Sequence, residues 1–379
     1  MARTPRLLYV ATEDWFFCSH FLPMARAARD AGFDVAVACR VRDKGAAIIA
    51  EGFRLLPVEA ERGRLAPVAV WRNLQALAAL MRAEAPDIVH LIALRPIVLG
   101  GLAARLAGVR RLVGAVTGLG PLGGRPSLPW KAAMAAIRAL LRRVIGGPGT
   151  VYLFENRDDP PTLGLDPSDP HTVAIVNGPG LNPDAYPATP MPPDNPLRTA
   201  MVSRMLWSKG VDVAVMGVRI ARARGANVTL SLYGAPDPAN RTSIDLPTLE
   251  TWGRESGIFW RGPTTDVATV WRQHHVAILP SHGEGMPRML VEAACSGRAL
   301  LATDVSGCRS LVQDGINGAL IPRDDADALA DRLVAMAADP DGVARMGAAA
   351  RATVLDGYTE AQVGSTVVAL YRSLLERPL

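Results

Sequence analysis

The sequence contains few cysteines, and they are widely spaced. Only four of the 379 residues are cysteine, and no two of them form a Cys-x-x-Cys pair. Such spacing supports neither a disulfide framework nor structural zinc. We therefore expect a protein of a reducing, cytoplasmic compartment, in which the cysteines are small buried apolar residues: Cys18, Cys39, Cys295 and Cys308.

Long apolar runs without charge are also absent. The nearest approach is 91–109, which Arg95 and Arg105 interrupt. A membrane-spanning helix needs about 20 consecutive, mostly apolar residues, so we predict none. Composition excludes a disordered or fibrous chain, because 49% of the residues are hydrophobic and 20% are charged. At roughly 150 residues per domain, the length predicts two or three domains.

Acidic residues are missing between Asp87 and Glu155, although the net charge of the whole chain is only +5. A preference for arginine over lysine does not explain the missing acids. A stretch of one sign favours a polyanion or an anionic membrane surface as partner, and we expect the membrane and no nucleic acid. The basic residues in the stretch are Arg95, Arg105, Arg110, Arg111, Arg125, Lys131, Arg138, Arg142 and Arg143.

The glycine-rich signatures of common cofactor sites are absent too. The first predicted strand, 7–11, is followed by Thr12-Glu13-Asp14-Trp15-Phe16-Phe17 and not by Gly-x-Gly-x-x-Gly. Two carboxylates would repel a pyrophosphate at this turn, which excludes NAD or FAD there. No P-loop motif occurs either. We therefore expect no cofactor.

Short apolar segments alternate with helical patterns through two parts of the chain, which predicts an α/β fold. Because the strands are almost wholly apolar, parallel sheets covered on both faces are expected. The predicted strands are 7–11, 34–39, 54–57, 87–92, 111–116, 150–154, 198–203, 227–233, 258–261, 275–279, 299–302 and 317–321. The predicted helices are 20–31, 43–51, 66–84, 95–107, 129–145, 208–223, 243–255, 266–272, 287–297, 306–313, 325–338 and, as a continuous helical pattern, 341–376.

Six prolines between residues 183 and 196 interrupt this alternation and indicate an interdomain linker, 177–197. We predict two Rossmann-like, doubly wound domains facing a cleft, 1–176 and 198–358. The last segment, 359–379, is predicted to be a helix that packs back toward the first domain. Ligands of such sheets bind at the carboxyl ends of the strands.

The segment 275–293 carries the most informative pattern of the second domain. A buried strand leads into a glycine-rich turn and then a helix that opens near Pro287. Backbone N–H groups around Gly285, Met286 and Arg288 favour an anion. Glu284 and Glu292 lie eight residues apart, which is about 12 Å along a helix. Two such carboxylates can accept hydrogen bonds from the hydroxyls of one ligand.

Two cations follow the first strand of the same domain. Arg204 and Lys209 are expected between the carboxyl end of strand 198–203 and the start of the next helix. Together they can neutralise a diphosphate without a metal ion, although isolated surface charges are the alternative. Asp339-Pro-Asp341 has the form of a metal motif, but its position between helices predicts a helix start.

These segments resemble the GT-B fold glycosyltransferases of family GT4, which retain the anomeric configuration of the transferred sugar. The resemblance covers essentially the whole chain. Two further segments, Glu13-Asp14-Trp15-Phe-Phe-x-Ser19-His20 and Thr117-Gly118-x-Gly120, are similar to bacterial members that extend lipid-linked polysaccharide precursors. The main matching segments are Arg204 with Lys209-Gly210, Ser281-x-x-Glu284-Gly with Glu292, Thr303-Asp304-x-x-Gly307-Cys308, Asp314-Gly-x-Asn-Gly318 and Asn177-Gly178.

The resemblance implies a metal-independent hexosyl- or N-acetylhexosaminyltransferase that uses a nucleotide sugar, with uridine as the usual base. Arg204 and Lys209 would hold the diphosphate, Glu292 the ribose, and Glu284 the transferred sugar. The backbone of 285–288 and His282 would lie beside that sugar. Arg261-Gly262 would line the base.

The same resemblance implies an acceptor hydroxyl on the side of the first domain, carried by a polyprenyl-diphosphate-linked saccharide. Candidates to line it are Asp14, His20, His90 and Thr117. His90 is expected at the carboxyl end of its strand, with a structural role as the alternative. This chain departs from many relatives, which have a glycine pair where it has Thr12-Glu13-Asp14.

Segment 129–145 predicts a basic amphipathic helix that docks on the inner face of the cytoplasmic membrane. Its apolar face comprises Met134, Ile137, Leu141 and Ile145; its basic face comprises Lys131, Arg138, Arg142 and Arg143; and Trp130 lies near one end. An ordinary domain helix is the alternative. Two other functions remain open: a GT-B fold nucleotide-sugar epimerase and a non-catalytic membrane-surface binding protein.

Overall fold

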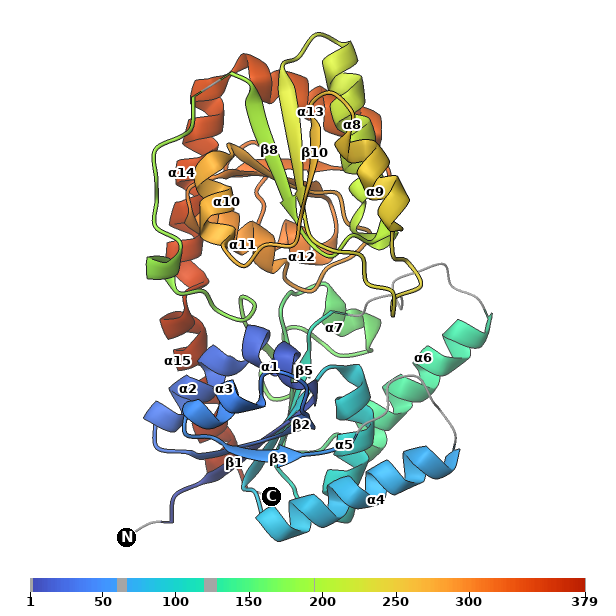
Figure 1. The fold of residues 1–379 in the computed structure, drawn as a ribbon. Helices are drawn as coiled ribbons and strands as arrows, with labels where there is room; N and C mark the ends of the chain where they lie inside the picture. Colours follow the sequence, from blue (N-terminus) through green and yellow to red (C-terminus); the bar gives the residue numbers. More distant parts are fainter. Residues whose placement is uncertain (1–2, 60–66, 119–127, 194, 379) are drawn as a thin grey trace. The chain divides into compact units, whose positions relative to one another are not determined.

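The structure is a computed structural model that describes residues 3–59, 67–118, 128–193 and 195–378 (Figure 1). The chain divides into two compact units. The first comprises residues 1–180 together with 360–379, and the second comprises residues 181–359. Each unit contains one parallel sheet with helices around it, so the predicted pair of Rossmann-like domains is confirmed.

The sheet of the first unit has the order β3-β2-β1-β4-β5-β6-β7. Side chains of its inner strands are buried on both faces, which explains why their sequence is almost wholly apolar. Among these strands, only β7 was not predicted, because a strand of three residues is too short for a recognisable hydrophobic pattern. The strands are β1 (Arg6–Glu13), β2 (Asp34–Arg40), β3 (Arg54–Pro57), β4 (Ile88–Ile92), β5 (Leu112–Val116), β6 (Thr150–Phe154) and β7 (Val173–Ile175).

Helices cover both faces of this sheet through two separate apolar cores (Figure 1). One face is covered by α1 (Asp14–His20), α2 (Leu22–Asp30), α3 (Gly45–Ala50) and α15 (Glu360–Glu376); α15 packs against α2. The other is covered by α4 (Pro67–Glu84), α5 (Leu94–Leu106), α6 (Leu128–Leu140) and its π-helical continuation η2 (Leu141–Ile145). The helix predicted for 20–31 begins at Leu22, because residues 14–20 form the separate helix α1 and Phe21 separates the two helices. A short helix, α7 (Asp159–Thr162), was not predicted.

The sheet of the second unit has the order β10-β9-β8-β11-β12-β13, and all six of its strands were predicted. They are β8 (Leu197–Val202), β9 (Val228–Tyr233), β10 (Ile258–Gly262), β11 (Val276–Leu279), β12 (Ala299–Thr303) and β13 (Gly318–Ile321). The helices are α8 (Val211–Ala223), α9 (Leu246–Gly253), α10 (Val267–Gln273), α11 (Arg288–Cys295), α12 (Ser306–Arg309), α13 (Ala326–Ala338) and α14 (Pro340–Gly357), with the short 3-10 helices η3 (Pro183–Ala185) and η4 (Trp207–Lys209).

The helical pattern predicted for 341–376 is two helices that belong to different units. Helix α14 ends at Gly357, and α15 begins at Glu360. The carboxylate of Asp339 accepts a hydrogen bond from the backbone N–H of Gly342 at 2.8 Å, so the predicted helix-start role of Asp339 is confirmed.

The proline-rich segment packs onto the second unit from residue 181 onward. Buried Arg298 donates to the carbonyl oxygen of Thr189 at 3.0 Å, and the His275 ring lies 3.2 Å from the carbonyl oxygen of Pro192. Arg351 donates to the carbonyl oxygen of Tyr186 at 3.1 Å. Prolines lack an N–H, and residues 183–193 form no strand; side chains of the unit contact three of their carbonyl groups instead.

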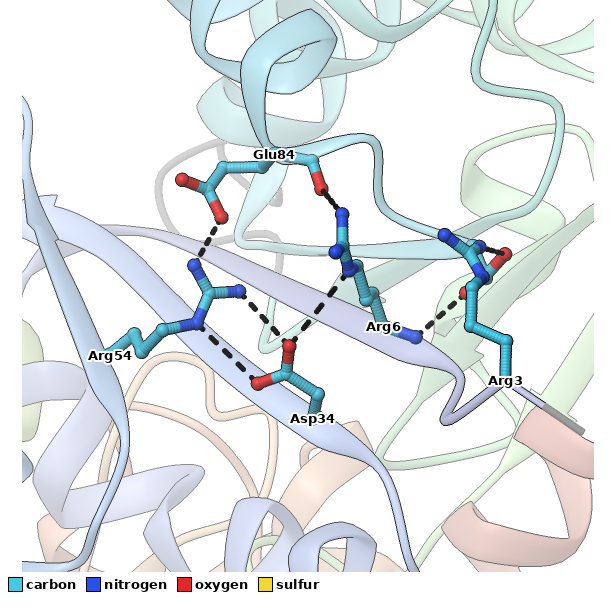
Figure 2. Close-up of polar contacts among 6 residues, drawn as sticks. Arg3, Arg6, Asp34, Arg54 and Glu84 are labelled. Carbon is cyan, nitrogen blue, oxygen red and sulfur yellow. Dashed lines mark hydrogen bonds and ion pairs between the residues drawn. The ribbon is translucent and has the colours of Figure 1, made fainter. Parts of the chain in front are cut away.

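Charged side chains surround the amino ends of the first sheet (Figure 2). Arg54 lies 3.3 Å from Asp34, which starts β2, and also pairs with Glu84 at the end of α4. Arg6 donates to the carbonyl oxygen of Glu84 at 3.0 Å. Half-exposed pairs of this kind contribute little to stability. They lie at the strand ends opposite those where ligands of parallel sheets bind.

Candidate functional site

A pocket of about 400 Å³ opens at the carboxyl ends of β8, β9 and β10 in the second unit. Its wall requires a glycine, because Gly234 has φ +149° and a Cβ there would lie 1.8 Å from the carbonyl oxygen of Ser203. The two loops therefore meet backbone to backbone. The lining residues are Val202, Ser203, Arg204, Tyr233, Gly234, Ala235, Pro236, Asp237, Pro238, Pro263 and Thr264.

Arg204 lines this pocket and is engaged by a carboxylate. Its guanidinium Nη1 lies 2.7 Å from Asp237 Oδ2, and its side chain is half exposed. Asp237 belongs to the loop after β9. An anionic ligand in the pocket would compete with Asp237 for the guanidinium.

Lys209 and Glu284, which lie 75 residues apart in sequence, form a second ion pair. The Lys209 Nζ is 2.6 Å from Glu284 Oε1 and 2.8 Å from Oε2. Glu284 is the more buried partner, with 10% of its side chain exposed against 25% for Lys209. The predicted phosphate cation and the predicted sugar carboxylate are thus in direct contact.

Close backbone packing holds this pair together. Gly210, which has φ +71°, follows Lys209, and a Cβ there would lie 2.0 Å from the carbonyl oxygen of Pro280. The backbone N–H of His282 donates to the carbonyl oxygen of Ser208 at 3.0 Å. On the other side, a Cβ on Gly307 would lie 2.1 Å from the carbonyl oxygen of Gly285. These contacts account for Gly210 and Gly307, two of the glycines in the segments that carry the family resemblance.

The segment between Glu284 and Glu292 is only partly helical, so the condition for a helical rise of about 12 Å is not met. Helix α11 begins at Arg288, with Pro287 as its cap in an extended conformation, so Glu284 and Gly285 lie in a non-helical loop. The backbone of this loop packs closely against Gly307. Eight residues therefore do not form the 12 Å helical rise expected from the sequence.

Glu292 is buried, and two side chains hold its carboxylate. The Tyr186 hydroxyl donates to Oε1 at 2.9 Å, and Arg288 Nε donates to the same oxygen at 2.8 Å. Burial, reinforced by the nearby Glu292 carboxylate, raises the pKa of Tyr186 well above its ordinary value, so the hydroxyl keeps its proton. Sequence reasoning missed Tyr186, because a tyrosine among prolines gives no signal of its partner.

The other predicted donor residues have different positions. His282 Nε2 lies 2.7 Å from Asp324 Oδ1, and both side chains are exposed. Met286 is buried in the apolar core of the unit. The Arg261 guanidinium lies 4.6 Å from the centre of the Phe259 ring and does not line the pocket; Pro263 and Thr264 line it instead. The Gly262 carbonyl oxygen accepts from the Gly234 N–H at 2.9 Å.

In the first unit, Asp14 is fully buried, and its carboxylate is hydrogen-bonded to the backbone. It accepts hydrogen bonds from the N–H groups of Trp15, Arg42 and Lys44 at 2.7 to 2.8 Å. Burial alone would raise the pKa of Asp14, but these N–H donors hold it below its ordinary value. The Asp14 carboxylate therefore joins the start of α1 to the loop after β2.

His90 lies in the middle of β4, so its predicted position at the end of the strand is wrong. It is fully buried, stacks on Tyr9 with ring centres 4.9 Å apart, and places Nδ1 2.6 Å from the hydroxyl of Tyr371 on α15. These contacts favour the structural role. The His20 Nδ1 lies 2.6 Å from Ser19 Oγ, and Thr117, which follows β5, is half-buried.

The prediction that the apolar face of α6 and η2 enters the membrane is wrong. Met134, Leu141 and Ile145 are buried in the core of the first unit, and Ile137 packs against them. The helix thus covers the sheet as an ordinary domain helix. The side chain of Trp130 lies outside the described residues. The basic side chains Lys131, Arg138, Arg142 and Arg143 are exposed.

The described residues contain neither a metal site nor a membrane-spanning helix. No group of three or more His, Cys, Asp or Glu side chains in this part of the chain is placed to hold a metal ion. Among the described helices, none is both long enough and apolar enough to cross a bilayer.

Comparison with known proteins gives two family matches. The model of the family "Glycosyl transferase 4-like" matches residues 6–144, and that of "Glycosyl transferases group 1" matches residues 197–339. The chain is 26% identical over 320 residues to alpha-maltose-1-phosphate synthase of Mycolicibacterium smegmatis, covering 77% of this chain and 80% of that protein. It is 29% identical over 167 residues to the amylovoran biosynthesis glycosyltransferase AmsK of Erwinia amylovora, covering 42% of this chain and 40% of that one.

Solved structures support the same fold. HepE of Anabaena in complex with UDP superposes with a TM-score of 0.76 at 17% identity, covering 98% of this chain and all of that one. At this identity the likeness shows the fold alone. The two family matches, one on each Rossmann-like unit, together with this superposition, identify the chain as a glycosyltransferase with the GT-B fold.

Proposed function

We propose that the protein transfers a hexosyl or N-acetylhexosaminyl group, with retention of anomeric configuration, from a UDP-sugar to a hydroxyl of a lipid-linked saccharide. The observation that carries the proposal is the contact between Lys209 and Glu284, which lies in the same unit as the pocket that Arg204 lines. This contact supports the proposal, because it brings the proposed phosphate cation within 2.6 Å of the proposed sugar carboxylate.

Donor binding in this proposal exchanges partners. The diphosphate takes Arg204 from Asp237 and Lys209 from Glu284, and the released Glu284 accepts hydrogen bonds from hydroxyls of the transferred sugar. When the bond between the anomeric carbon and the diphosphate oxygen breaks, negative charge grows on the leaving diphosphate. Two fixed cations stabilise that charge, so the proposed reaction requires no divalent metal ion.

Uridine is supported by the structural neighbours, because HepE of Anabaena has been solved with UDP and with UDP-glucose. A polysaccharide precursor as acceptor is supported by the relatives: AmsK serves amylovoran biosynthesis, and the WcaL protein of Escherichia coli is assigned to colanic acid biosynthesis. The similarity to AmsK covers 42% of this chain, and the similarity to WcaL covers 48% of it.

The proposed location is the inner face of the cytoplasmic membrane, where the protein would bind through electrostatic attraction alone. The apolar side of α6 is buried, so the four exposed basic residues of α6 and η2 would contact anionic lipid headgroups without inserting into them. Each basic residue near such a surface contributes about 1 kcal/mol. A lipid-linked acceptor would be available there.

The test is incubation with radiolabelled UDP-sugars, with and without a polyprenyl-diphosphate-linked saccharide. The expected result is label in the lipid-extractable fraction only when the acceptor is present. Conversion of the UDP-sugar to its epimer without acceptor would instead establish the epimerase. Binding of acceptor lipid with no turnover of any UDP-sugar would contradict the enzyme.

A further inference from the structure

Glu292 has two hydrogen-bond donors on one oxygen. Tyr186 and Arg288 both donate to Oε1, at 2.9 and 2.8 Å, and Arg288 lies one helical turn before Glu292 on α11. A carboxylate held by two donors of different direction loses its freedom to rotate. The second oxygen, Oε2, is then presented in a fixed direction.

Tyr186 comes from outside the helix that carries Glu292. It follows η3 in the proline-rich segment, 106 residues before Glu292 in the sequence. Arg351 of α14 donates to the carbonyl oxygen of Tyr186 and also to that of Cys295, the last residue of α11. One arginine thus ties the backbone of Tyr186 to the end of the helix on which Glu292 lies, while the Tyr186 hydroxyl reaches the carboxylate.

The protonation state of Tyr186 fits a lasting hydrogen-bond donor. Burial raises the pKa of Tyr186, and the Glu292 carboxylate raises it further, so the hydroxyl stays protonated at neutral pH. The Glu292 side chain is 8% exposed. A carboxylate so buried is costly unless donors satisfy it, and Tyr186 and Arg288 do so.

We propose that Tyr186 is a positioning residue of the donor site: its hydroxyl fixes the rotamer of Glu292 so that Oε2 meets the ribose hydroxyls of the nucleotide. This inference rests on the proposed role of Glu292 as the ribose ligand. It also makes nucleotide affinity depend on the proline-rich segment, because that segment supplies the hydroxyl.

The experiment compares Tyr186→Phe with wild-type protein by isothermal titration calorimetry, using UDP and 2′,3′-dideoxy-UDP as probes. A hydrogen bond to a charged group is typically worth at least about tenfold in an equilibrium constant. We therefore expect Tyr186→Phe to raise the Kd for UDP by about tenfold and to leave the Kd for the dideoxy nucleotide nearly unchanged. A general disturbance of the site by the lost hydroxyl, without a role in positioning Glu292 for the ribose, would weaken both nucleotides equally.

Tyr358→Phe is the matched control, because Tyr358 is a buried tyrosine of the same unit whose hydroxyl donates to the carbonyl oxygen of Ser310 at 2.6 Å. It should bind both nucleotides as the wild type does. If wild type prefers UDP over the dideoxy nucleotide and Tyr186→Phe keeps the full preference, the positioning role is overturned while the proposed function stands. If wild type binds no UDP, the proposed function itself fails.

Discussion

The Nζ of Lys209 lies between the two carboxylate oxygens of Glu284, at 2.6 and 2.8 Å. Each side chain neutralises the other in the absence of donor. Because a diphosphate and a sugar would have to replace these partners at the same time, the pair couples the two halves of the proposed donor site.

Replacing Lys209 by Ala should lower kcat by about 100-fold or more, since the lost cation stabilises charge that grows on the leaving group. The thermal midpoint should also fall, because the Glu284 side chain is only 10% exposed and loses its cationic partner. Steady-state kinetics together with the thermal midpoint check this, with Lys44→Ala, an exposed lysine of the first unit, as control. Near wild-type turnover of Lys209→Ala would refute the phosphate role.

Replacing Asp237 by Asn should tighten the binding of UDP severalfold, because Arg204 would no longer be engaged by a carboxylate 2.7 Å away. Calorimetric titration measures the effect. The control is Asp331→Asn, which removes one carboxylate from an exposed pair with Arg224 elsewhere in the same unit. Weaker binding by Asp237→Asn would mean that Asp237 supports the phosphate site.

Removal of divalent metal should leave activity intact. Arg204 and Lys209 would neutralise the diphosphate, so a metal ion has little charge left to balance. The measurement is turnover after dialysis against EDTA. Loss of activity that Mg²⁺ or Mn²⁺ restores would disprove metal independence.

Binding to anionic vesicles should disappear at high salt, because the apolar face of α6 is buried and only charge remains for docking. Changing Arg138, Arg142 and Arg143 to Gln should reduce co-sedimentation with vesicles that contain phosphatidylglycerol. The control removes the same charge by changing Arg323, Arg345 and Arg372, which are exposed elsewhere. Equal loss in both triple variants, or binding that survives 1 M salt, would argue against this docking face.

Acid should destabilise the protein through His90. Burial lowers the pKa of His90 from 6.5 to about 3. Between these values the unfolded chain binds a proton that the folded chain excludes, so the free energy of unfolding falls as pH decreases through this window. The slope from this group is at most about 1.4 kcal/mol per pH unit.

Denaturant unfolding of wild type and His90→Phe at pH 7 and pH 5 tests the assignment. The variant should lose less stability than wild type on acidification. His171→Gln, which changes an exposed histidine of the same unit, should keep the wild-type dependence. A His90→Phe variant with an unchanged pH dependence would show that His90 does not supply this linkage.

The sequence by itself determined the two Rossmann-like domains and most strand positions. Buried parallel strands such as β2 and β12 must be apolar on both faces, so their pattern is continuous and easily found. It also supplied Arg204, Lys209, Glu284 and Glu292, because these residues belong to local segments that resemble a known family.

Tertiary structure alone decided which side chains meet and which faces are covered. The hydroxyl of Tyr186 reaches Glu292 across 106 residues, and α15 returns to the first unit to place Tyr371 beside His90. In the sequence, the apolar stripe of α6 is compatible with both a membrane-docking helix and a core helix. In the structure, the core of the first unit buries this stripe. Local patterns specify the faces of an element, whereas the partner of each face depends on packing between segments that are distant in the chain.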